Sequence, residues 1–120
     1  MNTLLAIALG GAVGSVARYL LGRGIQRLTP YAFPFGTLAV NVIGCVIIGV
    51  IARQFLNDET RPVLQASLMV GFCGGFTTFS AFSLETLGLI QAGNWPRAIA
   101  YVLASVVLCL GGTALGYRLG

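Results

Sequence analysis

Aromatic and hydroxyl side chains interleave within residues 70–85, VGFCGGFTTFSAFSLE. Each kind recurs at i, i+3 and i+6, so two neighbouring stripes would run along a helix. These stripes are Phe76, Phe79 and Phe82, and Thr77, Ser80 and Ser83. Hydroxyls donate hydrogen bonds to an anion, and the electropositive edge of a phenyl ring helps to solvate a small anion that has lost its water. The alternative is that the rings only pack or face lipid.

Asn41 is the one amide side chain in an otherwise apolar stretch, residues 35–52. Thr37, Asn41 and Gly44 lie at i, i+4 and i+7, so they share one face of a helix. A buried amide needs a hydrogen-bonding partner or water. Two interpretations are open for Asn41: an interhelical hydrogen bond, or a donor that lines a pore.

The interleaved stretch lies within the longest apolar run of the chain, residues 63–90. A continuous helix of that length would be about 40 Å long, whereas the hydrocarbon core of a bilayer is about 30 Å thick. Its middle holds residues that stop or restart a helix: Gly71, Gly74, Gly75, Thr77 and Thr78. We therefore expect two half-helices that meet near Gly74–Thr78 at the membrane centre.

Such a break has chemical consequences, because irregular backbone inside a bilayer survives only if protein buries it or it lines a wet cavity. Free carbonyls at the end of the first half-helix suit a cation, and free N–H groups at the start of the second suit an anion. The alternative is a kink that serves packing alone.

Composition places the chain among membrane proteins. Of its 120 residues, 57% are hydrophobic and 8% are charged, and the mean hydropathy is +0.90. We predict an all-α membrane protein with a single four-helix transmembrane domain over residues 1–120. The expected spans are residues 4–21, 35–52, 63–90 and 98–117, with a loop over residues 22–34. Gly10 and Gly14, and likewise Gly112 and Gly116, have the spacing that lets a second helix approach closely.

Several function classes are disfavoured. The chain has no histidine, no acid pair and no phosphate-binding loop, so an enzyme is not expected. Its arginines are scattered between apolar spans and form no patch for nucleic acid. Three cysteines, Cys45, Cys73 and Cys109, fall within apolar spans and are interpreted as small packing residues, not as disulfides or metal ligands.

The distribution of arginine bears on orientation. Four spans put both termini and the loop 53–62 on one side. The arginines then divide almost equally: Arg53, Arg61 and Arg118 on that side, and Arg23, Arg27 and Arg97 on the other, with Arg18 just inside it. Orientation normally follows an excess of Lys and Arg in the cytoplasmic loops. Without one, we expect insertion in both orientations and an antiparallel dual-topology homodimer, in which carbonyls of two chains surround one cation on the two-fold axis.

Arg18 and Glu85 both lie about one turn inside the same side of the predicted bundle. Unpaired charges there are costly, so an ion pair within the chain is the simplest interpretation. The alternative makes Arg18 an electrostatic lure for anions in a vestibule. Tyr101, near the start of the fourth span, could be an interfacial belt residue.

Four motifs together resemble one family, the bacterial Fluc (CrcB) fluoride channels. They are GGAVGSVARY at residues 10–19, GTLAVNVIG at residues 36–44, GFCGGFTTFSAF at residues 71–82, and the pair Tyr101 and Ser105. The resemblance covers essentially the whole chain, and the third motif is very specific. Ser15 stands where alanine is usual, and Ala81 stands where threonine is usual.

This resemblance implies a passive, highly selective channel in the bacterial inner membrane that exports fluoride and relieves its toxicity. It implies a dual-topology homodimer with two antiparallel pores, surrounded by membrane lipid. The residues that it places on the fluoride path are Phe79, Phe82, Asn41, Ser80, Tyr101 and Ser105. It also implies a structural Na⁺ ion at the dimer centre, held by the backbone carbonyls of Gly74 and Thr77.

Two rival functions belong to other classes. A small dual-topology exporter of another substrate, such as a cationic drug, would need a titratable acid in its chamber. Spans one, two and four contain none, and Glu85 has an arginine within expected reach. A non-conducting assembly subunit would explain the packing glycines but not hydroxyls beside aromatics at a helix break.

Overall fold

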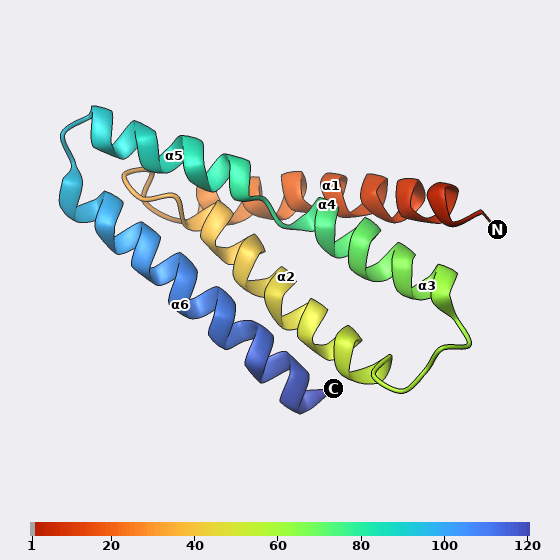
Figure 1. The fold of residues 1–120 in the computed structure, drawn as a ribbon. Helices are drawn as coiled ribbons and strands as arrows, with labels where there is room; N and C mark the ends of the chain where they lie inside the picture. The colour runs from red at the N-terminus through yellow and green to blue at the C-terminus, as the bar shows by residue number, and fades with distance from the viewer. Residues whose placement is uncertain (1) are drawn as a thin grey trace.

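The computed structural model describes residues 2–120 as a bundle of helices, shown in Figure 1. Its elements are α1 (Thr3–Arg27), α2 (Phe35–Gln54), α3 (Pro62–Ala66), the π-helix η1 (Ser67–Cys73), α4 (Gly74–Phe76), α5 (Phe79–Gln91) and α6 (Trp95–Leu119). No strand occurs among the described residues. Four segments are long and apolar enough to cross a membrane: Thr3–Arg27, Phe35–Gln54, Pro62–Gln91 and Trp95–Leu119. The predicted all-α class with four membrane-spanning helices is therefore confirmed.

The helices run further than the predicted spans at several ends. The expected loop over residues 22–34 is wrong in its first part, because α1 continues to Arg27. Gln26 explains where the chain turns. Its side chain accepts the Gly36 N–H at 3.0 Å and donates to the carbonyls of Phe33 at 3.1 Å and Pro30 at 3.2 Å. One polar side chain thus closes the short connection to α2.

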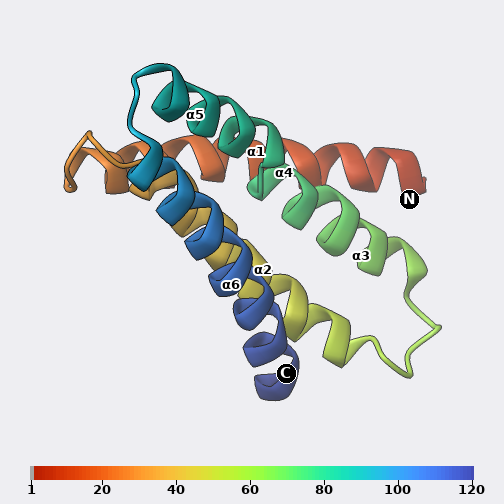
Figure 2. The same cartoon turned by 60° about the vertical axis from the view of Figure 1, so that its left-hand side comes forward.

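The bundle consists of two layers that Figures 1 and 2 show from different sides. In one layer α2 pairs lengthwise with α6, and in the other α1 packs against η1 and α4. Both termini and the α2–α3 connection lie towards one end of the bundle, and the other two connections lie towards the opposite end. This arrangement matches the up-and-down course expected of four spans.

Glycines make both layers close-packed, as the spacing predicted. A Cβ atom added at Gly10 or Gly14 would collide with a backbone carbonyl of η1, that of Ser67 or that of Phe72. A Cβ at Gly116 would likewise collide with the Val46 carbonyl on α2. Helices in a bilayer gain stability by such close backbone contact, because burial from water contributes little between lipid-exposed surfaces.

The π-helix was not predicted. Over Ser67–Cys73 the backbone adopts the wider π turn, which is rare and occurs mostly at functional sites or under local constraint. Its Gly71 approaches α1 so closely that a Cβ would lie 2.7 Å from the Ile7 carbonyl oxygen. The Ser67 hydroxyl donates to the Ala6 carbonyl at 2.8 Å. The wide turn therefore fits this half of the third span to the glycine face of α1.

The α2–α3 connection carries the one ion pair among the described residues, Arg61 to Asp58 at 2.6 Å. Hydrogen bonds from the Thr60 hydroxyl and N–H, and then from Arg61, hold the pKa of Asp58 at about 2, below its ordinary value. Because that pKa is lowered, the pairing persists at neutral pH and is lost only as the pH falls towards 2.

Replacing Gly14 with Ala is expected to lower the free energy of unfolding in detergent by about 1–3 kcal/mol, because the new Cβ overpacks against the Phe72 carbonyl. The matched control is Gly24→Ala on the same helix, where a Cβ meets nothing within 4 Å. That variant is expected to be neutral or up to about 1 kcal/mol more stable, since alanine favours helix. Thermal unfolding of both variants measures the difference, and equal effects would contradict the packing argument.

Candidate functional site

Two extended residues separate α4 from α5. Thr77 has φ −95° and ψ 157°, and Thr78 has φ −149° and ψ 118°. The Thr77 N–H and hydroxyl both donate to the Cys73 carbonyl, at 3.0 and 2.9 Å. The Thr78 hydroxyl accepts the Ala81 N–H at 3.1 Å and so caps the start of α5. Thr77 thus donates hydrogen bonds to the end of the first half-helix, and Thr78 caps the start of the second.

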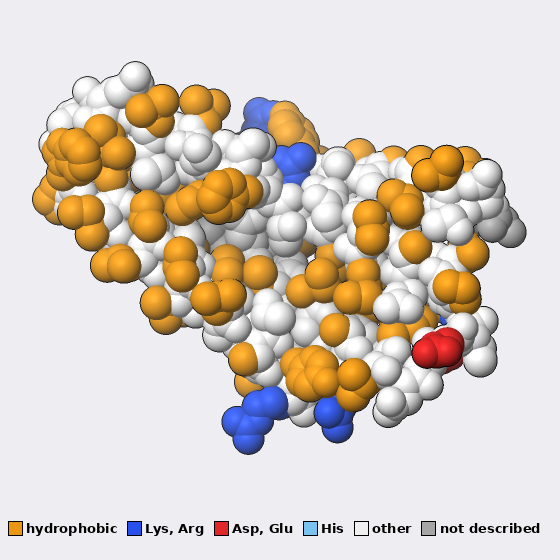
Figure 3. Space-filling view, in the orientation of Figure 1, with side chains coloured by type: hydrophobic (Ala, Val, Ile, Leu, Met, Phe, Trp, Pro, Cys, Tyr) orange, Lys and Arg blue, Asp and Glu red, His pale blue; other side chains and the backbone are white. Residues whose placement is uncertain are grey.

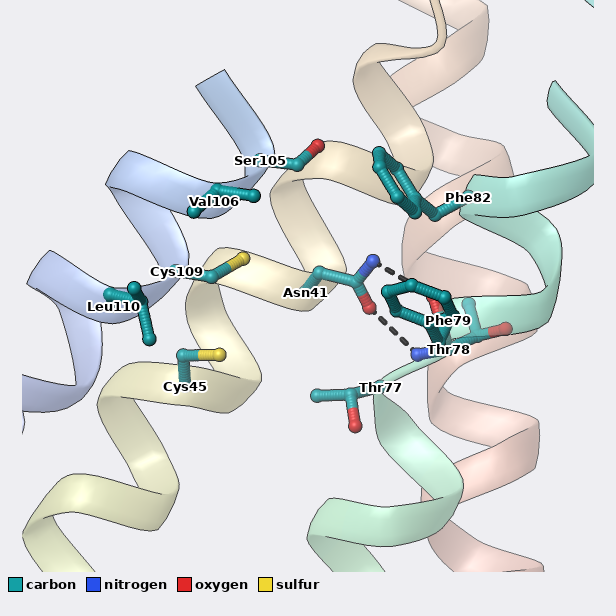
Figure 4. Close-up of a pocket in the computed structure, with 10 residues that line it drawn as sticks. All are labelled: Asn41, Cys45, Thr77, Thr78, Phe79, Phe82, Ser105, Val106, Cys109 and Leu110. Atoms are coloured by element: carbon teal, nitrogen blue, oxygen red, sulfur yellow. Dashed lines mark hydrogen bonds between the residues drawn. The ribbon is translucent and has the colours of Figure 1, made fainter. Parts of the chain in front are cut away.

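Asn41 holds the extended backbone from α2. Its Oδ1 accepts the Thr78 N–H at 2.7 Å, and its Nδ2 donates to the Thr78 carbonyl at 3.0 Å, as Figure 4 shows. The amide therefore replaces the backbone partners that a continuous helix would have given Thr78. This is the interhelical hydrogen bond weighed from the sequence. The second N–H of the amide is left for another acceptor.

A cavity of about 300 Å³ lies beside the interruption, between α2, α5 and α6. Figure 4 shows the residues that line it, which are Asn41, Cys45, Thr77, Thr78, Phe79, Phe82, Ser105, Val106, Cys109 and Leu110. Four residues predicted for the fluoride path, Asn41, Phe79, Phe82 and Ser105, thus share one cavity. The other two, Ser80 and Tyr101, do not line it.

Ser105 is the polar residue in this cavity that lacks a partner. The residue is only 7% exposed, and its Oγ has no hydrogen bond. In Figure 4 the hydroxyl projects from α6 towards Phe82. A buried hydroxyl without a partner is destabilising, typically by about 1–3 kcal/mol. A ligand or water that accepts its hydrogen bond would relieve this cost.

The aromatic stripe is shorter than the sequence predicted. Phe76 belongs to α4, is 3% exposed, and stacks on Phe72 with ring centroids 5.5 Å apart. The extended residues break the helical spacing, so including Phe76 in the stripe was wrong. Phe79 and Phe82 remain together, with centroids 5.3 Å apart. Phe79 is 79% exposed in the protomer.

Tyr101 is fully buried, so the interfacial belt interpretation is wrong. Its hydroxyl donates to Glu85 Oε1 at 3.0 Å, and its ring packs against Phe82 with centroids 5.1 Å apart. Ser80 is exposed, and its Oγ lies 3.2 Å from the Thr78 hydroxyl. Both residues thus adjoin the cavity through a neighbour that lines it.

The expected ion pair between Arg18 and Glu85 is wrong. Arg18 Nε donates to the Gly75 carbonyl at 3.0 Å, while Glu85 accepts from the Thr37 hydroxyl at 2.9 Å as well as from Tyr101. Because α4 ends at Phe76, the Gly75 carbonyl is not used by a continuing helix and is available to Arg18.

Arg18 and Glu85 nevertheless line the same cavity, a second one of about 380 Å³ that Arg23 also lines. The Thr37 side chain on its wall already holds the Glu85 carboxylate. The two charges therefore share a space without direct contact. None of these three hydrogen bonds was predictable from charge alone, because carbonyls and hydroxyls compete with the oppositely charged side chain.

The two carbonyls predicted to hold a cation lie next to the interruption. Gly74 is exposed, and a Cβ added there would meet nothing within 4 Å. The Thr78 N–H, which would reach the Gly74 carbonyl in a continuous helix, bonds to Asn41 instead. Gly74 thus lies at an open face of the protomer, whereas Thr77 is half-buried.

Comparisons with known proteins agree in naming one family. A family model described as CrcB-like protein, Camphor Resistance (CrcB), matches residues 5–117. A relative from Geobacter sulfurreducens, named Fluoride-specific ion channel FluC, is 54% identical over 117 residues, which are 97% of this chain and 94% of the relative. Another of that name, from Phocaeicola vulgatus, is 47% identical over 120 residues, covering 97% and 96%. The chain therefore belongs to the CrcB family.

Proposed function

We propose that this chain is a passive, selective fluoride channel that exports fluoride from the bacterial cytoplasm across the inner membrane and so relieves its toxicity. The observation that carries the proposal is the buried, unpartnered Ser105 hydroxyl in the cavity beside the helix interruption. Its support is the name of the relatives, Fluoride-specific ion channel FluC, at up to 54% identity over nearly the whole chain.

The cavity offers what a small dehydrated anion needs. Ser105 can donate a hydrogen bond, and Asn41 has an amide N–H that its bond to the Thr78 carbonyl does not use. The rings of Phe79 and Phe82 supply electropositive edges, which attract an anion without trapping it. The start of α5, next to Thr78, adds the positive end of a helix dipole. These donors act together at one place.

Passive conduction also requires that the anion can leave. None of the ten described residues that line the cavity carries a formal charge, so binding there does not form an ion pair. Weak, multi-point coordination suits permeation, because an ion must enter readily and depart readily. Arg18 and Arg23 in the second cavity would instead raise the local concentration of anions at a vestibule. Glu85 there would have a mainly structural role, through Thr37 and Tyr101.

The protomer is proposed to work as an antiparallel dual-topology homodimer, with the helix interruption near the membrane centre. Its surface is largely apolar, and Figure 3 shows charged side chains mainly around the rim of the visible face. Phe79 is 79% exposed although it lines the cavity, so a second copy would complete the wall on that side. The balanced arginines permit both orientations.

A structural Na⁺ ion at the dimer centre would be held by the Gly74 and Thr77 carbonyls of both copies. The donor set fits, since hard cations prefer oxygen ligands and carbonyls at the end of a helix carry partial negative charge. The exposed position of Gly74 leaves room for a second copy to approach. Bound there, the ion would supply positive charge that joins two carbonyl-rich helix ends.

The alternatives are a small dual-topology transporter of another substrate and a non-conducting assembly subunit. A proton-coupled transporter would use Glu85, whose carboxylate is occupied by two hydroxyls and lies outside the cavity that holds Ser105. An assembly subunit would have no use for a buried hydroxyl kept without a partner. Fluoride flux distinguishes the channel from both alternatives.

Replacing Ser105 with Ala is expected to slow fluoride efflux from liposomes by about tenfold or more, because a hydrogen bond to a charged group contributes about 1.5–3 kcal/mol. Stability should not fall, since the hydroxyl has no partner in the protein. Efflux is read with a fluoride electrode, and a potassium ionophore balances charge. Ser83→Ala, on the exposed part of α5, is the matched control. Normal fluoride flux in the Ser105 variant would contradict the proposal that this cavity is part of the fluoride path.

Replacing Phe79 with Leu is expected to reduce fluoride flux while leaving the protomer folded. The leucine keeps an apolar side chain at this largely exposed position but removes the electropositive ring edge. Parallel measurements of chloride efflux test whether selectivity also changes. If Phe79→Leu conducts fluoride as the unmodified chain does, the proposal that the Phe79 ring contributes to conduction is wrong. The proposed role of Ser105 is not affected by that result.

Replacing Na⁺ by N-methyl-glucamine is expected to weaken the dimer, because the bulky organic cation cannot enter a carbonyl cage. The dimer fraction in dilute detergent, measured by light scattering, should fall and recover when Na⁺ is restored. K⁺ in the same assay tests which ion the cage prefers. An equal dimer fraction with all three cations would exclude a structural Na⁺.

A further inference from the structure

Two of the three cysteines line the cavity that holds Ser105. Cys45 comes from α2 and Cys109 from α6, and Figure 4 shows both sulfur atoms projecting from their helices on the cavity side. Both are free thiols and both are half-buried. Cys73, by contrast, is fully buried on η1 and does not line the cavity. The interpretation of all three cysteines as small packing residues stays a prediction, and the structure adds that two of them border a cavity.

The two thiols are neighbours across the α2–α6 contact. Cys45 and Cys109 line the same cavity from two helices that pack against each other. Gly112, one turn further along α6, brings the helices together there: a Cβ added to it would lie 3.7 Å from the Cys45 Cβ. Both helices are long and packed along their length, so the relative position of the two thiols is set by the fold.

We propose that Cys45 and Cys109 form a binding site for one soft monovalent cation, of the Cu⁺ or Ag⁺ class, and that its occupancy closes the cavity. Thiolates are the ligands that select such ions, whereas the nearby hydroxyl of Ser105 and amide of Asn41 are hard donors that bind them poorly. Two ligands suffice for an ion that accepts linear coordination. The closure, though not the binding, rests on the proposed channel function.

Binding of the cation to the two thiols needs no oxidation or reduction. Each thiol loses its proton to water, and two sulfur–metal bonds form, so a monovalent ion with two thiolates carries a net charge of −1. The positive end of α5, which begins at Phe79 beside the same cavity, favours that charge. The occupied site would both fill part of a cavity of about 300 Å³ and repel an incoming anion. Block would therefore be steric and electrostatic together.

The first measurement counts bound Ag⁺ by native mass spectrometry on the purified chain in chloride-free buffer. The background variant is Cys73→Ala, which removes the one cysteine outside the cavity. We expect one Ag⁺ per chain in the unmodified protein and in this background. Adding Cys45→Ala or Cys109→Ala should weaken binding by more than about 100-fold, since a direct ligand matters at least as much as an outer-shell partner. No bound Ag⁺ in the unmodified chain, or equal binding after loss of both cavity cysteines, overturns the site.

A second measurement needs no variant and so does not depend on their folding. N-ethylmaleimide labelling of the unmodified chain is followed by peptide mapping, with and without Ag⁺. Ag⁺ should protect Cys45 and Cys109 together. Protection of only one of them, or of neither, contradicts a shared site.

Closure is tested by fluoride efflux from liposomes in chloride-free buffer with Ag⁺ added. Efflux by the unmodified chain and by Cys73→Ala should fall to that of protein-free liposomes, whereas the Cys45→Ala/Cys109→Ala double variant should keep its own untreated rate. Bound Ag⁺ with undiminished efflux would overturn closure. If the untreated chain shows no fluoride efflux at all, the channel function fails, while the binding count still decides the thiol site.

Discussion

The need to give hydrogen-bonding partners to the backbone around the α4–α5 interruption is the constraint on which the rest of the structure depends. A bilayer offers no water to loose N–H and C=O groups, so an interrupted helix must find its partners within the protein. Asn41 supplies both partners for Thr78, and Arg18 takes the Gly75 carbonyl. These two side chains come from different helices, so α1 and α2 must both be in place before the interruption is satisfied.

Close packing by glycine is what brings those side chains within reach. Gly10 and Gly14 let α1 approach η1 at the level of backbone atoms, which carries Arg18, one turn further along, to Gly75. Gly44 similarly abuts Thr77, so Asn41, one turn before it on α2, faces Thr78. The small residues thus do more than stabilise the bundle, because their positions set which polar groups can meet at the interruption.

The sequence predicted the helices well because apolar runs, glycine spacing and threonine caps are local signals. It also identified Asn41 as the one amide in an apolar helix, and the family resemblance placed Ser105 on the expected fluoride path. It could not predict partners that depend on distance in three dimensions. Arg18 bonds to a carbonyl and not to Glu85, and the placement of Cys45 and Cys109 on one cavity depends on how α2 and α6 align. The π-helix was missed because we attribute it to the fit between the η1 and α1 backbones, which cannot be deduced from side-chain types.

Two buried hydroxyls on α6 differ in their hydrogen bonding. Tyr101 and Ser105 are one turn apart on the same face and both are buried, yet Tyr101 donates to Glu85 while Ser105 has no partner. A carboxylate close to the cavity would compete with a dehydrated anion for every donor there. Thr37 and Tyr101 hold Glu85 away from the cavity, so the Ser105 hydroxyl stays unpaired. The two hydrogen bonds of Glu85 are therefore a condition for the anion binding that we propose at Ser105.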